Sequence, residues 1–270
     1  MNICFVGGGN MASALIGGLL KRGFSSAHMH VVEINVDSCK RLHKDFGVRA
    51  ESDMIAGGSH SDVVVLAVKP QQIHEVAKKL KPLLGDRLVI SIAAGIRAAD
   101  LSRWLDSQNV VRAMPNTPAL IRSCITGLYA LPWVSEEQKV DAQTILAAVG
   151  KTLWLENEAM MDAVTAVSGS GPAYVFYFME AMQEAARELG FNDKDARRLV
   201  LDTFVGATKL AEASDEAVSE LRAKVTSKNG TTERALLSME KNAVKQHIIG
   251  ALHAAADRSR ELGDELGKEK

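Results

Sequence analysis

The chain has 270 residues, of which 47% are hydrophobic and 24% charged, and its formal net charge is −1. This is the composition of a globular protein with a sizeable core, and the length predicts two domains. The balanced charge offers no overall field for nucleic acid or an anionic membrane, so we predict neither as a partner. Three cysteines, Cys4, Cys39 and Cys124, show no paired spacing, which indicates a reduced, cytoplasmic protein.

Residues 3–20 carry no charge and are the one segment that resembles a signal peptide or a membrane anchor. No basic residue precedes them, and five of them are glycines. The first positive charges, Lys21 and Arg22, come after the segment, which is the reverse of the order in a secretory signal. We therefore interpret the segment as part of a folded domain.

The first half of the chain alternates short β-branched runs with longer amphipathic stretches, a pattern typical of a parallel sheet with crossover helices. The predicted strands are 2–6, 30–34, 63–68, 88–93, 110–113, 125–130 and 152–155. The predicted helices are 11–21, 36–46, 72–83, 98–105 and 136–149, with glycines at positions 23, 47, 85 and 150 to end them. We predict a doubly wound α/β domain of the Rossmann type over residues 1–155.

From residue 156 onward the strand signals disappear and apolar residues recur at helical spacing. The predicted helices are 174–189, 193–212, one capped by Ser214, and a long final helix whose apolar stripe comprises Leu236, Val244, Ile248, Leu252 and Ala255. Residues 156–270 number only 115, yet nearly every helix has an apolar face. We predict an all-helical domain whose faces pack against a second copy of the chain.

The run GGGNMA at residues 7–12 follows the first predicted strand and precedes the first helix. In that position it matches the G-x-G-x-x-A form of the dinucleotide fingerprint, whose backbone amides hold a pyrophosphate. The residues assigned to this contact are Gly7, Gly9, Asn10 and Met11. The alternative is a tight turn without a ligand.

Glu33 ends the second predicted strand, 21 positions after that run, where a ribose-binding carboxylate is expected. A carboxylate there accepts from the ribose hydroxyls of NADH and repels the 2′-phosphate of NADPH. If Glu33 turns away, the phosphate could be held by Asn35, Ser38, Lys40 and Arg41. The sequence leaves this choice open, and a solvated strand end is the alternative interpretation of Glu33.

Small residues and prolines follow three further strands. They are Val68, Lys69 and Pro70, then Ala93, Ala94 and Gly95, then Asn116 and Thr117 between Pro115 and Pro118. Ligands of open α/β sheets collect at the carboxyl ends of the strands, and small residues let a flat nicotinamide approach the backbone. We assign these residues to the cofactor site, apart from Pro115 and Pro118. The alternative is that the prolines only end strands.

Two polar segments interrupt the helical half. Residues 167–174 read VSGSGPAY and predict a helix that breaks and restarts. Residues 225–232 read VTSKNGTT and precede a helix that begins near Thr232. The amides and hydroxyls of this second segment would form an anion pocket, for which a carboxylate is the simplest guest, and a helix cap by Thr231 is the alternative.

Other kinds of catalytic site lack a motif. The histidines show no metal spacing beyond His28-x-His30, so we predict no metal. No G-x-S-x-G elbow, phosphate-binding P-loop or Cys/His pair occurs. Hydride transfer requires little from side chains because the cofactor carries the reactive atom, so the motifs favour a dinucleotide-dependent oxidoreductase.

Taken in order, the motifs resemble those of the pyrroline-5-carboxylate reductase family over almost the whole chain. They read FVGGGNMA at 5–12, AVKPQ at 67–71, SIAAGI at 91–96, MPNTP at 114–118, SGSGPAY at 168–174 and S-x-x-GTT at 227–232. One difference lies in the last motif, where Lys228 and Asn229 stand in place of the family's usual Pro-Gly. That difference concerns the flexibility of the loop more than the activity.

The resemblance implies an enzyme of proline biosynthesis that reduces 1-pyrroline-5-carboxylate to proline with NADPH or NADH, NADPH being favoured. It implies that Thr232 hydrogen-bonds the ring nitrogen and donates or relays a proton. The remaining substrate contacts would come from Ser227, Gly230, Thr231, Ser168 and Gly169. It also implies homodimers through the helical domain, active sites near the seam between subunits, and further association, with a pentamer of dimers as the candidate.

Two other functions are alternatives. A β-hydroxyacid dehydrogenase shares the glycine run and the helical second domain but relies on a lysine with a following asparagine, and Lys241-Asn242 has no supporting motif here. A non-catalytic dinucleotide sensor would lose the anion loop, whereas Thr231 and Thr232 are present.

Overall fold

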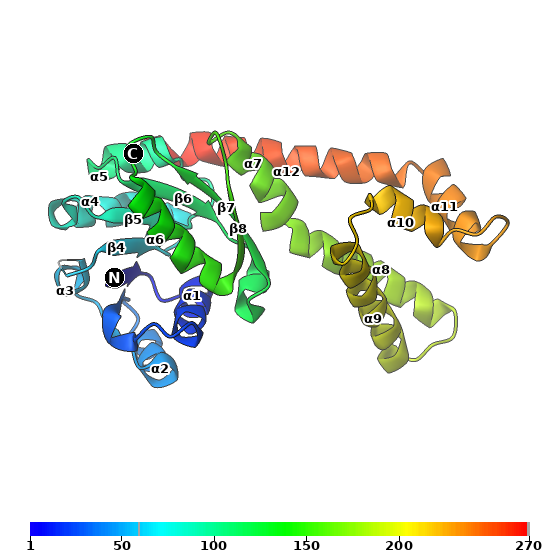
Figure 1. Ribbon diagram of the computed structural model, residues 1–270, viewed down its shortest axis with the longest axis horizontal. Coiled ribbons are helices and arrows are strands. Elements are labelled where there is room, and N and C mark those ends of the chain that lie inside the picture. Colours follow the sequence, from blue (N-terminus) through cyan, green and yellow to red (C-terminus); the bar gives the residue numbers. More distant parts are fainter. Residues whose placement is uncertain (59, 269–270) are drawn as a thin grey trace. The chain divides into compact units, whose positions relative to one another are not determined.

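The computed structural model describes residues 1–58 and 60–268, and the chain divides into two compact units. The first unit combines Met1–Ser170 with Ala255–Lys270, and the second is Gly171–Ala254. The first unit thus extends past residue 155 to include a short helix, a π-helical turn and the end of the last helix (Figure 1).

An eight-stranded sheet forms the centre of the first unit, in the order β3-β2-β1-β4-β5-β6-β7-β8. The strands are β1 Ile3–Val6, β2 Met29–Val32, β3 Arg49–Glu51, β4 Val63–Leu66, β5 Leu88–Ser91, β6 Val110–Met114, β7 Cys124–Ala130 and β8 Gly150–Trp154. Seven of them lie where strands were predicted, and β3 was missed because it has only three residues, two of them charged.

The sheet is parallel except between β6 and β7, which pair antiparallel, with Met114 opposite Gly127. The predicted parallel sheet is thus confirmed except at this one pair. Only residues 115–123 join the two strands, and they form a single 3₁₀ turn, η3 Thr117–Ile121, which is too short for a crossover helix. The longer connection through α6 Glu136–Leu146 makes β8 parallel to β7 again.

Helices cover both faces of the sheet, as a doubly wound fold requires. One face packs against α1 Asn10–Lys21, α2 Val36–Phe46 and α6, and the other against α4 Ile73–Leu84 and α5 Ala98–Leu105. Successive residues of β1 alternate between the two cores, since Phe5 joins the first and Cys4 the second. Burial raises the pKa of the Cys4 thiol to about 12, which keeps it protonated and inert. A short helix, α3 Met54–Gly58, precedes β4.

The uncharged segment at the start of the chain is β1, the glycine loop and most of α1. No helix within the described residues is long and apolar enough to cross a membrane. The interpretation of this segment as part of a folded domain is therefore confirmed.

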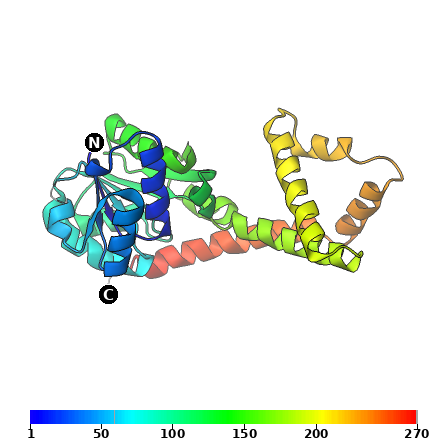
Figure 2. The ribbon, with the colours of Figure 1, turned by 90° about the horizontal axis from the view of Figure 1, so that it is seen from below.

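The second unit is built from α8 Gly171–Glu188, α9 Asp193–Glu212, α10 Val218–Lys224, α11 Thr231–Lys241 and the first part of α12 Val244–Leu266. Helices α8 and α9 pack against each other as a hairpin (Figure 2). No residue of α8 is buried, and its large apolar side chains Phe176 and Tyr177 are 64% and 71% exposed.

Two helix predictions for this unit were wrong. Ser214 does not cap the third helix, because its hydroxyl accepts a hydrogen bond from Glu216 N and the helix begins after Ala217. The long final helix is two helices, which separate at Ala243, where φ is 52°. A residue in the left-handed region cannot continue an α-helix, so the chain turns there.

Candidate active site

The loops that follow β1, β4 and β5 meet at the carboxyl edge of the sheet. Backbone hydrogen bonds connect them in sequence, from Gly7 N to Val32 O (2.8 Å), from Ala67 N to Val6 O (2.8 Å) and from Ile92 N to Leu66 O (3.1 Å). The edge therefore brings together three of the segments that the sequence predicts to bind the cofactor.

The glycine loop has the geometry of an anion cradle. Gly7 has φ +102°, and a Cβ there would lie 2.7 Å from Ala67 O, so no other residue fits without a shift. Gly9 is the N-cap of α1, and nothing lies within 4 Å of where its Cβ would be. No side chain caps α1 and its first turn has no acidic residue, so its first amides are left for a ligand. These residues fit a dinucleotide's pyrophosphate. Asn10 is exposed and Met11 half-buried at this helix start.

Glu33 lies beside the glycine loop, and both of its carboxylate oxygens bind backbone amides. Oε2 accepts from Gly8 N and Oε1 from Asn35 N, each at 2.8 Å. Arg41 Nη2 donates to Gly8 O at 3.1 Å, so the loop is held from both sides. The side chain of Asn35 caps α2 by accepting from Ser38 N. The structure thus gives Glu33 a local role that the sequence did not suggest.

The next two loops lie close to the glycines. Val68 Cγ1 lies 2.9 Å from the position of a Cβ on Gly7, and Lys69 and Pro70 begin the 3₁₀ turn η2 Pro70–Gln72. After β5, Ala93 is buried and its amide donates to Ser91 Oγ at 3.4 Å. Gly95 has φ +75° and turns the chain toward α5, with the half-buried Ala94 before it.

Asn116 is 9% exposed and is hydrogen-bonded within the protein. Its Nδ2 donates to Ser168 O at 3.1 Å, and its Oδ1 accepts from Ile125 N at 3.3 Å. Asn116 therefore connects the loop after β6, strand β7 and the turn that contains Ser168. The next residue, Thr117, is exposed at the start of η3.

The predicted break in the first helix of the second half is a π-helical turn, Thr165–Gly169, between α7 Met160–Val164 and α8. Ser168 Oγ lies buried in this turn with no hydrogen-bond partner among the described residues. A Cβ on Gly169 would lie 2.5 Å from Met114 Cε, so the turn packs closely on the end of β6. π-Turns of this kind occur frequently at functional sites.

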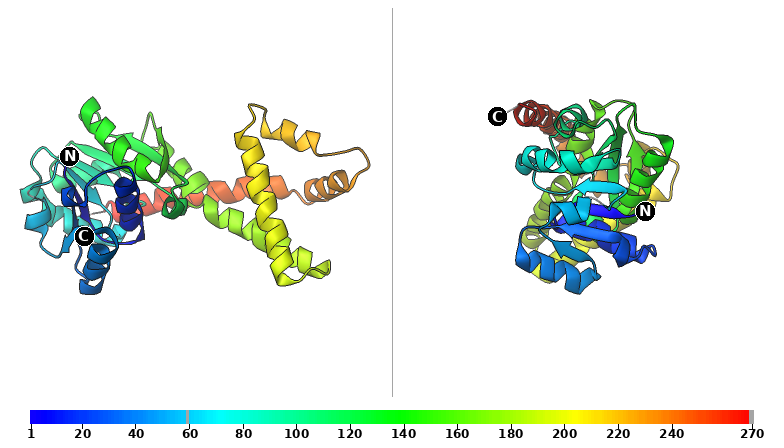
Figure 3. Two further views of the ribbon diagram at one scale, coloured as in Figure 1. Left: turned by 60° about the horizontal axis from the view of Figure 1, so that its bottom comes forward. Right: turned by 90° about the vertical axis from the view of Figure 1, so that its left-hand side faces the viewer.

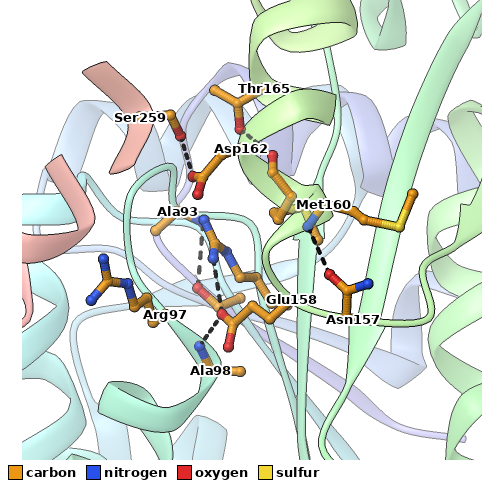
Figure 4. Close-up of polar contacts among 12 residues, drawn as sticks. Ala93, Arg97, Ala98, Asn157, Glu158, Met160, Asp162, Thr165 and Ser259 are labelled. Atoms are coloured by element: carbon orange, nitrogen blue, oxygen red, sulfur yellow. Dashed lines mark hydrogen bonds and ion pairs between the residues drawn. The ribbon is translucent and has the colours of Figure 1, made fainter. Parts of the chain in front are cut away.

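A partly buried ion pair between β6 and the segment before α7 was missed from the sequence. Arg112 on β6 is 5% exposed, and its Nη1 donates to Glu158 Oε1 at 2.9 Å. The same oxygen accepts from Ala98 N, at the start of α5, at 2.7 Å (Figure 4). Glu158 thereby joins β6 to the helix that follows the Ala93–Gly95 loop. The one signal for it in the sequence was a lone charge inside an apolar strand.

The second unit contains the predicted anion loop, between α10 and α11. Gly230 is the N-cap of α11 and no side chain caps the helix, so the alternative of a cap by Thr231 is wrong. A Cβ on Gly230 would lie 2.4 Å from Ser227 Oγ, and Gly230 N donates to Ser227 O at 3.0 Å. Thr231 is exposed and Thr232 half-buried in the first turn of the helix.

Asn229 has φ +60°, the left-handed conformation that a glycine adopts readily and that asparagine tolerates. Its amide donates to Glu233 Oε2 at 2.7 Å. The substitution of the family's Pro-Gly by Lys228 and Asn229 therefore keeps a turn of the required kind.

Two other candidates are not supported by the geometry. No group of three or more potential ligands among the described residues is placed to hold a metal ion. Lys241 is exposed at the end of α11, and Asn242 Nδ2 donates to Ser238 O at 2.8 Å as a helix-terminating contact.

The class of protein that this fold and site define is the nicotinamide-dinucleotide oxidoreductases. Their pattern is a doubly wound sheet, a glycine loop at its carboxyl edge that leads into an uncapped helix, and a helical unit after it. Residues 2–95 match the family model of the coenzyme F420-dependent NADP oxidoreductases, and residues 158–262 match that of the pyrroline-5-carboxylate reductase dimerisation domain. The chain belongs to the pyrroline-5-carboxylate reductase family, with an NAD(P)H-binding domain followed by the family's dimerisation domain.

The relatives support this over the full length. The chain is 45% identical to the pyrroline-5-carboxylate reductase of Pseudomonas aeruginosa over 98% of each chain. A solved pyrroline-5-carboxylate reductase of Coxiella burnetii is 41% identical, with a TM-score of 0.92 over 97% of this chain and 98% of that one. The Plasmodium falciparum enzyme, solved with NADP bound, is 30% identical with a TM-score of 0.88 over the same shares.

Proposed function

We propose that this protein reduces the C=N bond of 1-pyrroline-5-carboxylate to give proline, with NAD(P)H as the hydride donor. The observation that carries the proposal is the uncapped start of α11, where Gly230 lies against Ser227 and two threonines follow. A cyclic imine with one carboxylate requires an anion site and a hydrogen-bonding group beside it, and this loop offers both.

The cofactor's pyrophosphate is proposed to bind the glycine loop at the amides of Gly9, Asn10 and Met11, and to lie close to the backbone of Gly7, whose own amide donates to Val32 O. The further contacts proposed are Glu33 and Asn35 toward the ribose, and Val68, Lys69, Pro70, Ala93, Ala94, Gly95, Asn116 and Thr117 toward the rest of the cofactor. When bound, the reduced nicotinamide supplies the hydride. NADPH is the proposed preference, supported by the NADP found in the Plasmodium falciparum relative.

The substrate is proposed to bind through its carboxylate at Ser227, Gly230 and Thr231, with Ser168 and Gly169 as further contacts. The buried Ser168 hydroxyl, which has no partner among the described residues, is available for such a contact. Hydride addition to the imine carbon moves the C=N electron pair to nitrogen, which takes up one proton. Thr232 is proposed to orient the ring nitrogen and to donate or relay that proton.

We further propose two functional domains, a dinucleotide-binding domain over 1–155 and a substrate-binding and dimerisation domain over 156–270. The dimerisation match over residues 158–262 supports the second of these. We propose a cytoplasmic location and a pentamer of dimers as the full assembly; sedimentation of the purified protein would measure its size.

The decisive experiment mixes the protein with 1-pyrroline-5-carboxylate and NADPH or NADH and follows the absorbance of the reduced nicotinamide. Thr232→Ala is expected to lower kcat/KM about 10²-fold without changing the affinity for the cofactor, because it removes only the group beside the ring nitrogen.

The matched control is Thr226→Ala in the same loop. The Thr226 hydroxyl donates to Arg222 O within α10, so its removal is expected to leave kcat/KM unchanged. A folded wild-type protein without turnover on either cofactor would refute the proposed function. A loss of cofactor binding in Thr232→Ala would contradict the proposed role of Thr232 at the ring nitrogen of the substrate.

A further inference from the structure

The last turns of α12, red in Figure 3, lie against the loop that joins β5 to α5. At Gly95 a Cβ would lie 3.2 Å from Leu266 Cδ1 and 3.3 Å from Leu262 Cβ, so the two leucines cover the backbone of that loop. Leu266 also packs against the core beneath α4 and α5. The end of a helix that begins at Val244 thus contacts a loop some 170 residues earlier in the chain.

A charged contact lies beside these leucines. Arg97 is the N-cap of α5, two residues after Gly95, and its Nη2 donates to Asp264 Oδ1 at 2.5 Å. The guanidinium lies on the helix at Gly263, where a Cβ would be 3.0 Å from Arg97 Nε. Arg97 can lie this close to the helix because Gly263 has no side chain.

Two further hydrogen bonds hold the same stretch of helix. Ser259 is 3% exposed and its Oγ donates to Asp162 Oδ1 on α7 at 2.6 Å (Figure 4). Arg103 Nη2, on α5, donates to Gly267 O at 3.0 Å. The helix end is therefore anchored to α7 and α5, on either side of the contact with Gly95.

We propose that residues 259–266 of α12 are a positioning element for the cofactor, which holds the Ala93–Gly95 loop in the shape that receives the nicotinamide. The inference rests on the proposed function only in taking this loop as part of the cofactor site. The part of α12 that contacts this loop belongs to the first unit, together with the loop itself. Asp264 and Leu266 lie just beyond the residues that match the dimerisation model.

The test compares three single variants of the full-length protein. Asp264→Asn removes the charge that faces Arg97, and Leu266→Ala removes the Cδ1 that packs on Gly95. Glu265→Gln is the matched control, since Glu265 is the next residue on the same turn and pairs with Arg258 of the same helix. The dissociation constant of NADPH is measured by fluorescence without substrate, and kcat, both KM values and the melting temperature are measured alongside.

Asp264→Asn is expected to raise the dissociation constant and the KM for NADPH about two- to five-fold, the range of a partly exposed ion pair. Leu266→Ala is expected to raise them more, and both should leave the substrate KM within twofold. Glu265→Gln should change neither, and Asp264→Glu should restore part of the affinity.

The inference is overturned if the first two variants lower the melting temperature but bind NADPH like the wild type, or if Glu265→Gln weakens binding equally. Because NADPH binding is measured without substrate, a wild type that binds NADPH but does not turn over would refute the proposed function alone.

Discussion

Asn116 has both ends of its side-chain amide hydrogen-bonded within the protein, to Ser168 O and to Ile125 N. Glu33 is similar, since each of its oxygens accepts from a backbone amide of the carboxyl edge. Arg112 and Glu158 form a third such contact, which also caps α5. At the scale of residues, these polar groups give the backbone of the predicted cofactor loops a defined shape, which favours binding because less order must be gained on association.

A substitution at Glu33 separates its contact with the backbone amides from its proposed contact with the cofactor ribose. Glu33→Gln removes the negative charge and keeps one acceptor for the amides, so the preference should shift toward NADPH. We expect the ratio of kcat/KM for NADPH to that for NADH to rise several-fold, about 1 kcal/mol of relieved repulsion. Steady-state kinetics with both cofactors measures this ratio. An unchanged ratio would confine Glu33 to holding Gly8 and Asn35.

At the scale of elements, two helices begin at a glycine N-cap, which has no side chain to cap the first turn. α2, α6 and α9 each have a side-chain cap, from Asn35, Ser135 and Asn192. α1 and α11 begin at Gly9 and Gly230 without one. Helices α4, α5, α7 and α10 also lack a cap from their N-cap side chain, but none of them begins at a glycine. A glycine N-cap leaves the first amides free and lets an anion approach the backbone, which suits α1 and α11 to the cofactor's pyrophosphate and the substrate's carboxylate.

The turn before α11 provides the prediction at this scale. Asn229→Ala places an ordinary side chain at φ +60° and is expected to lower the free energy of unfolding by about 1 kcal/mol, whereas Asn229→Gly should leave it unchanged or raise it. Urea unfolding measures both, with Lys228→Ala as the control at the exposed neighbour. Equal stabilities of the alanine and glycine variants would contradict the assigned turn.

At the scale of the whole molecule, the second unit does not form a closed core by itself. α8 has no buried residue, and α9 carries Leu199, Val205 and Leu210 at 48%, 41% and 56% exposure. Contiguous apolar faces of this kind mark an interface, and the dimerisation match covers them. The apolar core of this unit is therefore to be understood per dimer.

Phe176→Glu tests that interpretation, because a buried charge at a dimer interface opposes association. We expect the variant to elute as a smaller species and to melt at a lower temperature, with less dependence on protein concentration. Light scattering coupled to size exclusion measures the mass. Val140→Glu, the same change at a 62% exposed apolar residue on α6 of the first unit, should remain dimeric. A Phe176→Glu dimer as stable as the wild type would place the interface elsewhere.

The sequence by itself determined the features that depend on local pattern. Strand and helix periods, glycines at helix ends and the position of the glycine run between a strand and a helix are contained in short windows, and they predicted the doubly wound domain, the helical half and the family. The motifs also identified the carboxyl-edge loops, since parallel strands bring their ends to one edge. The sequence analysis did not predict the three-residue strand β3 or the helix break at Ala243, because the local sequence signals of both are weak.

The tertiary structure alone decided which distant groups meet. Asn116 and Ser168 are 52 residues apart, Arg112 and Glu158 are 46 apart, and Arg97 and Asp264 are 167 apart. The tertiary structure also decided the antiparallel direction of β7 and which amides Glu33 binds. Each depends on the path of the chain between the partners, and neither propensity nor spacing encodes that path, because long-range contacts follow from how the elements pack.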